Sequence, residues 1–255
     1  MSQLESSVAW VVPSCDAYSD LWPPLFQAIN VFWPANTYCK YLVTNELTPS
    51  YMGVDIITTG TDVSWSDNLL YALDRIEEPY VALNIDDLIL CESVDHDAVV
   101  AVVADFVRTK GNYLRLNPTP PGRGWGTVGE VPRGDLYRAS TIFSLWRKEI
   151  LQHVLRRGES AWHFEIYGSA RTDAFDKWFA SRHTLIKHVN LVLKGKVDPR
   201  ALAILLRCGI DYDSNRASLS QREVFTRRVM ELRSQALLLL PRRLARSIRN
   251  VFPPT

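Results

Sequence analysis

Cysteines are scarce in this chain and stand far apart. The four of them are Cys15, Cys39, Cys91 and Cys208, and they form neither a CxxC pair nor a cluster with histidine. This spacing excludes a disulfide framework and a zinc site. It indicates reduced, mostly buried thiols in a cytoplasmic protein.

Long apolar runs are missing as well. No stretch approaches the ~20 apolar residues that a membrane-spanning helix needs. The N-terminus has no basic region followed by an apolar core, so we expect no secretory signal. With 47% hydrophobic and 22% charged residues, the composition is that of a soluble globular enzyme with one large core or one core and a small appendage.

Charge is nearly balanced overall but unevenly distributed. The net charge is +1, and the segment from Arg222 to the end holds eight Arg and two Glu. That segment therefore carries +6, which leaves −5 on residues 1–221. The sequence predicts a slightly acidic globule with a strongly basic tail.

Two adjacent carboxylates interrupt an apolar run between Tyr80 and Leu90. The run reads as a buried strand, stops at Asp86-Asp87 and then resumes. An unpaired carboxylate in an apolar interior is costly, and two neighbours also repel each other. A divalent metal carrying phosphates would stabilise them at the carboxyl end of a strand, where open α/β sheets bind ligands. The alternative is that Asp86 caps a turn and Asp87 is solvated.

Strand and helix patterns alternate along the first half of the chain. We expect strands over 7–13, 40–45, 54–58, 80–90 and 112–116, and helices over 18–32, 65–76 and 95–109. Residues 117–133 hold four Pro and four Gly and are expected to form a long loop. A strand over 137–144, helices over 145–157 and 162–168 and a strand near 185–189 should follow. This alternation predicts an α/β fold with a mostly parallel sheet covered on both faces.

Five short segments in this order resemble nucleotide-sugar-dependent glycosyltransferases of the GT-A fold, particularly small bacterial enzymes that build surface polysaccharides. The segments are Val11-Val12-Pro13-Ser14-Cys15-Asp16, Trp65-Ser66-Asp67-Asn68-Leu69-Leu70, Leu83-Asn84-Ile85-Asp86-Asp87, Ser144-Leu145-Trp146-Arg147-Lys148 and Ser160-Ala161-Trp162-His163-Phe164-Glu165. The resemblance implies a GT-A (Rossmann-like) domain over residues 1–198, followed by a helical, Arg-rich extension over 199–255. The strand ends in Asn-Ile-Asp-Asp where the family has a fuller Asp-x-Asp.

The resemblance also implies a donor site. Asp87, with Asp86, would bind Mg²⁺ or Mn²⁺ bridging the donor diphosphate, since carboxylates are the hard ligands that these ions prefer. The residues that would contact the nucleotide sugar are Pro13, Ser14, Asp16, Trp65, Ser66, Asn84 and Asp86. An ordinary Asp turn at Asp16 and a core position for Trp65 are the alternatives.

Glu165 is the expected catalytic base. The residue corresponds to the acidic residue of inverting relatives, and we expect Trp162, Phe164 and Tyr167 to surround it with an apolar pocket that raises its pKa. The alternative is a helix-start Glu favoured by the helix dipole. The expected acceptor-binding residues are Trp125, Trp146, Arg147, Trp162 and His163, although one of Trp146 and Trp162 is expected to be core.

The basic tail has an apolar helix face with arginines crowded elsewhere, and Pro241 should kink it. A basic amphipathic helix is typical of an interfacial anchor on anionic lipid. We therefore expect a cytoplasmic protein that lies peripherally on the inner face of the membrane. A helix packed on the core and a homodimer contact are the alternatives. Nucleic acid is not an expected partner, because residues 1–221 are acidic and show no recognised motif.

Two further functions stay open. A sugar nucleotidyltransferase also combines an α/β sheet with a carboxylate-bound metal, but it should have a Gly-rich, basic phosphate loop after the first strand. Here that loop reads Pro13-Ser14-Cys15-Asp16. A non-catalytic scaffold that retains the fold is the third possibility.

Overall fold

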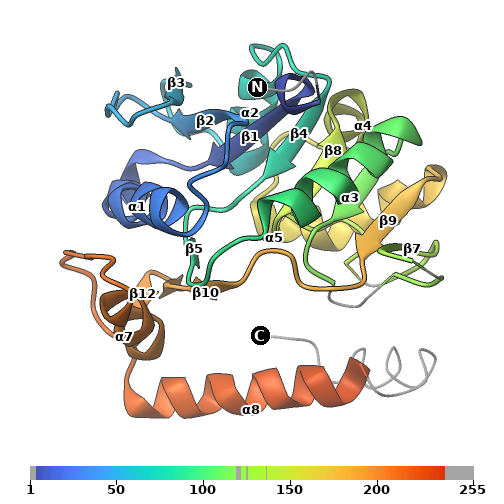
Figure 1. Cartoon of the computed structure of the whole chain (residues 1–255). Helices are drawn as coiled ribbons and strands as arrows, with labels where there is room; N and C mark the ends of the chain where they lie inside the picture. The colour runs from blue at the N-terminus through green and yellow to red at the C-terminus, as the bar shows by residue number, and fades with distance from the viewer. Residues whose placement is uncertain (1–3, 119–121, 125, 136, 239–255) are drawn as a thin grey trace.

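An eight-stranded sheet forms the centre of the molecule (Figure 1). The computed structural model describes residues 4–118, 122–124, 126–135 and 137–238. The strands follow the order β3-β2-β1-β4-β8-β6-β9-β7. Their bounds are β1 Val8–Pro13, β2 Cys39–Thr44, β3 Val54–Thr58, β4 Tyr80–Leu83, β6 Tyr113–Arg115, β7 Val128–Glu130, β8 Ser144–Arg147 and β9 Trp178–Ser181. Only β8 and β7 run antiparallel to their neighbours, so the sheet is mostly parallel as expected.

Helices cover both faces of this sheet, which explains the apolar character of its strands. Helices α1 Trp22–Phe32 and α3 His96–Arg108 pack on one face, and α2 Trp65–Leu73 and α4 Lys148–Val154 pack on the other. Alternate residues of β1 serve the two layers: Trp10 joins the cluster with α1, and Val11 joins the cluster with α2. A strand buried on both faces is apolar at every position, as β1 is.

The register of the central strands defines one functional edge. Leu83, the last residue of β4, pairs with Ser144, the first residue of β8, and Ser144 pairs with Arg115 at the end of β6. The chain that leaves β4 and β6 and the chain that enters β8 therefore meet at the same edge. Arg147 pairs with Tyr80 and lies at the opposite edge.

The segment from 137 to 157 differs from the sequence prediction. The predicted strand over 137–144 does not form. The observed strand, β8, begins only at Ser144 and occupies the start of the predicted helix over 145–157. The helical part of that range is α4. Tyr137 and Phe143 have positive φ values of 51° and 41°, which break an extended strand. Leu145 and Trp146 instead alternate between the two core layers, as strand residues do.

Two smaller predictions are also corrected. The expected loop over 117–133 contains the edge strand β7, which pairs with β9, a strand that the sequence reading missed. The N-cap of α2 is Ser64, whose hydroxyl accepts a hydrogen bond from the Asp67 N–H at 3.1 Å. All four cysteines are free, as expected, but they are half-buried.

The chain after β9 folds back beneath the sheet (Figure 1). Strand β10 His188–Asn190 pairs with β5 Leu88–Leu90, and β11 Val192–Leu193 pairs with β12 Lys196–Val197. Two helices follow, α7 Pro199–Arg207 and α8 Gln221–Leu238. Ala201 and Leu205 of α7 are buried in the same cluster as α1, so α7 packs on the body of the protein.

Short helical segments complete the described chain. These are η1 Glu5–Ser7, η2 Asp16–Leu21, α5 Ala161–His163, the π-helical turn η3 Phe164–Gly168, α6 Ser169–Arg171 and η4 Thr172–Ala174. Across the described residues, no helix combines the length and the apolar character that crossing a bilayer demands. Pro241 and the tail from residue 239 onward lie outside the described residues.

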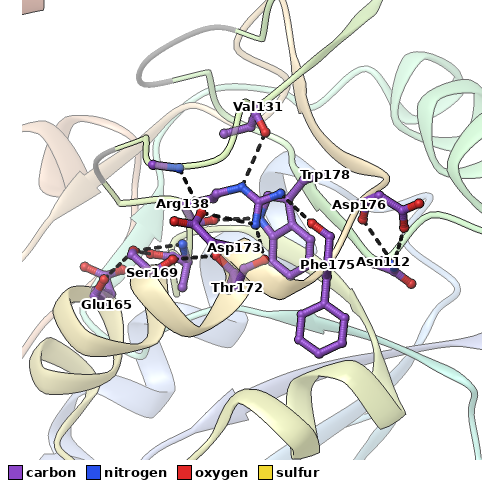
Figure 2. Close-up of polar contacts among 12 residues, drawn as sticks. Asn112, Val131, Arg138, Glu165, Ser169, Thr172, Asp173, Phe175, Asp176 and Trp178 are labelled. Carbon is purple, nitrogen blue, oxygen red and sulfur yellow. Dashed lines mark hydrogen bonds and ion pairs between the residues drawn. The ribbon is translucent and has the colours of Figure 1, made fainter. Parts of the chain in front are cut away.

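A buried arginine fastens the chain before β8 to the helices after η3 (Figure 2). Arg138 is 1% exposed, and its guanidinium donates to the carbonyls of Val131, Thr172 and Phe175. The same group stacks on the Trp178 ring at 4.6 Å. Carbonyls left unpaired in this core would each cost about 1–3 kcal/mol.

We therefore expect Arg138→Met to lower the free energy of unfolding by about 2–4 kcal/mol, because buried carbonyls lose their donor. The measurement is the urea midpoint of unfolding. The control is Arg108→Met on α3, where a 74% exposed side chain pairs with Asp105, and the expected loss is below about 0.5 kcal/mol. Equal midpoints for the two variants would contradict this view of Arg138.

Candidate functional site

Asp86 lies in the turn between β4 and β5, at the carboxyl edge of the sheet. Its side chain is buried, and Ser14 Oγ donates a hydrogen bond to its Oδ2. Trp22 Nε1 in turn donates to Ser14 Oγ at 2.7 Å. This chain of two hydrogen bonds joins the turn after β4 to the turn after β1, two segments that the sequence reading assigned to one donor site.

Asp87 is tied to the segment that follows β10. Leu191 N–H donates to the Asp87 carbonyl at 2.8 Å. With the Asn190 amide oriented to satisfy its hydrogen bonds, Nδ2 donates to Asp87 Oδ2 at 3.1 Å and to the Val192 carbonyl at 2.8 Å. Neither link was visible in the sequence, since about one hundred residues separate the partners.

Burial dominates the electrostatics of the two carboxyls. Desolvation raises the pKa of Asp86 from its ordinary 3.8 to about 6, against a lowering by the Ser14 hydrogen bond. Desolvation, and then the charge of Asp86, raise the pKa of Asp87 to about 7. In the described part of the chain, no Lys or Arg forms an ion pair with either carboxyl.

Asn84, which directly follows β4, also has a buried polar side chain. It is 0% exposed, and neither Oδ1 nor Nδ2 has a hydrogen-bond partner among the described residues. Buried amides are normally hydrogen-bonded, and this one lies two residues before Asp86 in the sequence.

The two carboxylates can hold a divalent cation only if a bound phosphate ligand supplies further coordinating oxygens. Among the residues described, no three His, Cys, Asp or Glu side chains gather as a metal group. Mg²⁺ is commonly held by one or two carboxylates together with substrate phosphates. Asp86 and Asp87 would hold such an ion, and the remaining ligands would come from phosphate and water.

Asp16 shapes the loop after β1. Its carboxylate accepts hydrogen bonds from the backbone N–H groups of Asn45, Glu46 and Leu47 at 2.9–3.1 Å. Those bonds occupy both oxygens, so Asp16 fastens this loop to the loop after β2. Pro13 is the buried last residue of β1.

Ser66 and Trp65 face protein neighbours. Ser66 is 0% exposed; its N–H donates to the Glu159 carbonyl, and its hydroxyl accepts from Glu159 N–H. The half-buried Trp65 ring packs on Phe164 at 5.5 Å. Both residues thus join α2 to the segments on either side of α5, Ser66 to Glu159 before it and Trp65 to Phe164 of η3.

Glu165 lies in the π-helical turn η3 and is held by the chain before β8. Its Oε1 accepts from Thr141 N at 2.7 Å, Thr141 Oγ1 at 2.9 Å and Ser140 Oγ at 3.2 Å. No hydrogen bond from the described residues reaches Oε2. Because Ser140 and Thr141 lead into Ser144 at the carboxyl edge, the carboxylate lies at the same edge as Asp86. Rare π-helical turns often occur at functional sites.

The expected apolar pocket around Glu165 is not formed. Phe164 is 0% exposed and points into the core, whereas Trp162 and Tyr167 are 47% and 58% exposed. Hydroxyl and amide groups surround Oε1 in place of aromatic rings. Phe164 and Tyr167 stand one and two positions from Glu165, and side chains at those spacings on a helix point in different directions.

Two of the expected acceptor-binding residues lie away from this edge. Trp146 is 0% exposed, between Tyr113 and Trp178, and its ring has no face for a sugar. Arg147 lies at the opposite edge of the sheet and donates to the Lys110 carbonyl. Trp146 is thus the one of Trp146 and Trp162 that is core, and the expectation for Arg147 is corrected because strand β8 runs away from the site.

Trp162 and His163 remain exposed on α5. Trp162 lies 6.3 Å from the Tyr137 ring, and His163 lies 5.8 Å from the Tyr167 ring. Trp125 falls outside the described residues.

Sequence reasoning missed several residues of this edge. Arg115 is 2% exposed at the end of β6 and donates to the Tyr137 carbonyl. His188 contacts the Asn117 amide at 3.2 Å and the Phe143 ring at 5.0 Å, and burial lowers its pKa. No sequence motif predicted these residues, because each is brought to the edge by contacts with segments distant in the sequence.

We predict that, without added metal, the protein loses stability as pH rises from about 4 to about 7. A folded-state pKa raised to about 7 at Asp87 means that the folded form binds the proton more tightly, so its stabilisation is full at low pH and is lost as pH rises through that value. Asp87→Asn should flatten this slope and raise stability at pH 8 by on the order of 3 kcal/mol.

Thermal unfolding between pH 4 and pH 8 measures this effect, and Mn²⁺ at pH 7.5 should stabilise the wild type but not Asp87→Asn. Asp211→Asn, at an exposed position, is the control and should follow the wild type. A wild-type stability that is flat with pH would contradict the assignment.

No family model matches the chain, and no curated protein matches it in sequence. Among solved structures, S. aureus TarS 1-349 is similar with a TM-score of 0.50 and 12% identity, covering 71% of this chain and 59% of that one. The same TarS fragment in complex with UDP-GlcNAc gives 0.49 and 11% identity over 71% and 57% of the two chains. The UTP-bound UGPase from Acinetobacter baumannii gives 0.49 and 10% identity over 82% and 95%.

This chain thus spans less than two thirds of the TarS fragment. At 12% identity the likeness to TarS concerns the fold alone. That fold is the expected one: an α/β, GT-A (Rossmann-like) fold with a mostly parallel central sheet flanked by helices.

Proposed function

We propose that this protein is an inverting glycosyltransferase. It moves a sugar from a nucleotide-diphosphate donor to a hydroxyl of a glycan or lipid-linked acceptor in bacterial surface polysaccharide synthesis. One observation carries the proposal: Glu165 is held by three hydrogen bonds on Oε1 while Oε2 is left unpaired by the described residues, at the edge that also carries Asp86 and Asp87.

The donor side of the site is acidic and needs a cation. Asp86 and Asp87 hold Mg²⁺ or Mn²⁺ in this proposal, and the ion supplies charge neutralisation for the departing diphosphate. Ser14 orients Asp86, and Asn190 orients Asp87. The Asn84 amide, which pairs with none of the described residues, would contact the donor.

On the acceptor side, Glu165 acts as the general base. Oε2 takes the proton of the acceptor hydroxyl while that oxygen forms a bond to the anomeric carbon of the donor sugar. The bond from that carbon to the phosphate oxygen breaks, and its electron pair leaves with the diphosphate. A single in-line displacement of this kind inverts the anomeric configuration.

Exposed apolar side chains next to Glu165, two of them aromatic, support a carbohydrate acceptor. Trp162, Ile166 and Tyr167 are 47%, 42% and 58% exposed on consecutive turns of α5 and η3. Rings with one wet face suit the apolar faces of sugars. His163, beside Tyr167, belongs to the same surface.

The two alternatives predict different features. A sugar nucleotidyltransferase needs a basic, Gly-rich loop after β1, but residues 14–21 contain Asp16 and Asp20 and no Lys, Arg or Gly. A non-catalytic scaffold would not require the Glu165 carboxylate to be held through Oε1 alone. We therefore favour glycosyl transfer, and pyrophosphate release from a nucleoside triphosphate and a sugar phosphate is the assay that would favour the nucleotidyltransferase.

We also propose that the protein lies on the inner face of the membrane, where a lipid-linked acceptor resides. Phe225, Val229 and Leu232 of α8 are 67%, 47% and 58% exposed at helical spacing. The basic residues that follow are Arg242, Arg243, Arg246 and Arg249. Anionic lipid attracts such clusters by about 1 kcal/mol for each basic residue.

Glu165→Gln should lower turnover by a factor on the order of 10² to 10⁴, because the amide is a far poorer proton acceptor of nearly the same shape. Donor affinity should stay within about twofold, since the diphosphate is held by Asp86, Asp87 and the ion. The measurements are steady-state transfer to a soluble acceptor and the anomeric configuration of the product.

The matched control is Glu149→Gln, an exposed carboxylate at the far edge of the sheet, which should leave turnover unchanged. Near-normal turnover of Glu165→Gln, or a product with retained configuration, would show that Glu165 only begins a helix.

Replacing Arg242, Arg243, Arg246 and Arg249 together by Gln should lower the affinity for anionic vesicles, measured by co-sedimentation, by up to ~10³-fold. Four charges that each contribute about 1 kcal/mol to binding are lost. Neutral vesicles and the single Arg108→Gln variant are the controls. Unchanged sedimentation of the fourfold variant would exclude the anchor, leaving a packed helix or a dimer contact.

A further inference from the structure

The segment that follows α7 crosses back over the turn after β1. Gln27 of α1 anchors its start, donating to the Gly209 carbonyl at 3.1 Å and accepting from Asp211 N at 3.2 Å. Tyr212 then donates to Asp20 Oδ2 at 2.8 Å. We call residues 209–216 the strap. The strap brings the beginning of the C-terminal extension onto the segment that follows Ser14.

Arg216, at the end of the strap, is held with little freedom. Its Nε and Nη2 pair with the two oxygens of Asp20, each at 2.7 Å, and Nη2 also donates to the Ala17 carbonyl at 2.7 Å. The guanidinium stacks over the Tyr18 ring at 4.6 Å. In the described part of the chain, Nη1 has no hydrogen-bond partner, so one arm of a rigid fork is available.

The charges around this arm are unbalanced. Asp86 and Asp87 place two carboxylates at the site, a diphosphate adds further negative charge, and one divalent ion offsets only part of the sum. Residues 14–21 and 84–88, which form the two turns, contain no Lys or Arg. Arg216 supplies positive charge from the strap, and its charge opposes the burial that raises the pKa of Asp86.

We propose that Arg216 binds the diphosphate of the nucleotide donor through Nη1. This inference rests on the proposed function and deepens it. Arginine pairs with phosphate oxygens through fixed N–H groups, and the Asp20 pairing holds the fork in place so that little side-chain entropy is lost on binding. The C-terminal extension is then part of the donor site as well as a route to the membrane.

Full-length Arg216→Gln tests the assignment. UDP, GDP, dTDP and CDP are titrated with Mn²⁺ into the wild type, and the tightest of the four is compared with its own nucleoside, which lacks both phosphates. Arg216→Gln should weaken the diphosphate by about 10- to 100-fold, the size of a charge-assisted hydrogen bond, and leave the nucleoside unchanged. Arg216→Lys, which keeps the charge and loses the fork, should fall between the two.

A purely structural role for Arg216 has a different signature. Tyr212→Phe removes the hydrogen bond from the Tyr212 hydroxyl to Asp20 and keeps Arg216; its diphosphate affinity should stay within about twofold of the wild type. If Arg216→Gln weakens the nucleoside and the diphosphate equally, or if Tyr212→Phe weakens the diphosphate as much as Arg216→Gln does, Arg216 only fastens the strap and the assignment is overturned.

The outcome also separates this inference from the proposed function. Wild-type affinity for a diphosphate that persists unchanged in Arg216→Gln overturns the Arg216 assignment alone. A wild type that binds none of the four diphosphates overturns both. Diphosphate binding that requires both Arg216 and Asp87, the latter tested as Asp87→Asn, supports both.

Discussion

The hydrogen bond from Ser14 to Asp86 joins the two turns on which the donor side of the site depends. It forms because β1 and β4 are parallel neighbours, so the residues that follow each strand leave the sheet at the same edge. Burial there raises the pKa of Asp86 and of Asp87, which makes the pair costly in its charged form. In the proposed function, a cation and phosphates would offset that cost.

A separate set of contacts positions Glu165. Arg138 fastens the chain before β8 to the carbonyls of Thr172 and Phe175, and Ser169 accepts from Ala139 N at 3.0 Å while donating to the Glu165 carbonyl at 2.6 Å (Figure 2). These contacts fix the loop that carries Ser140 and Thr141. The orientation of the carboxylate is therefore a property of a buried polar network, in which every member has partners.

The C-terminal extension connects these elements by charge. Its strap brings Arg216 to Asp20 and Tyr18, and Arg227 of α8 pairs with Asp198 at 2.7 Å beside the hairpin that follows Asn190. Arg227 thus joins the described part of the basic tail to an acidic residue of the globule.

The sequence by itself determined the α/β fold class, most of the strands and the two carboxylates that interrupt the apolar run over 80–90, because period-two and period-3.6 patterns record which faces are buried. It did not determine β8, where positive φ values at Tyr137 and Phe143 override strand propensity. Tertiary structure alone decided that Trp146 is core, that hydroxyls rather than aromatic rings surround Glu165, and that Arg216 reaches the first loop. Those outcomes depend on contacts between segments up to about two hundred residues apart, which no local pattern encodes.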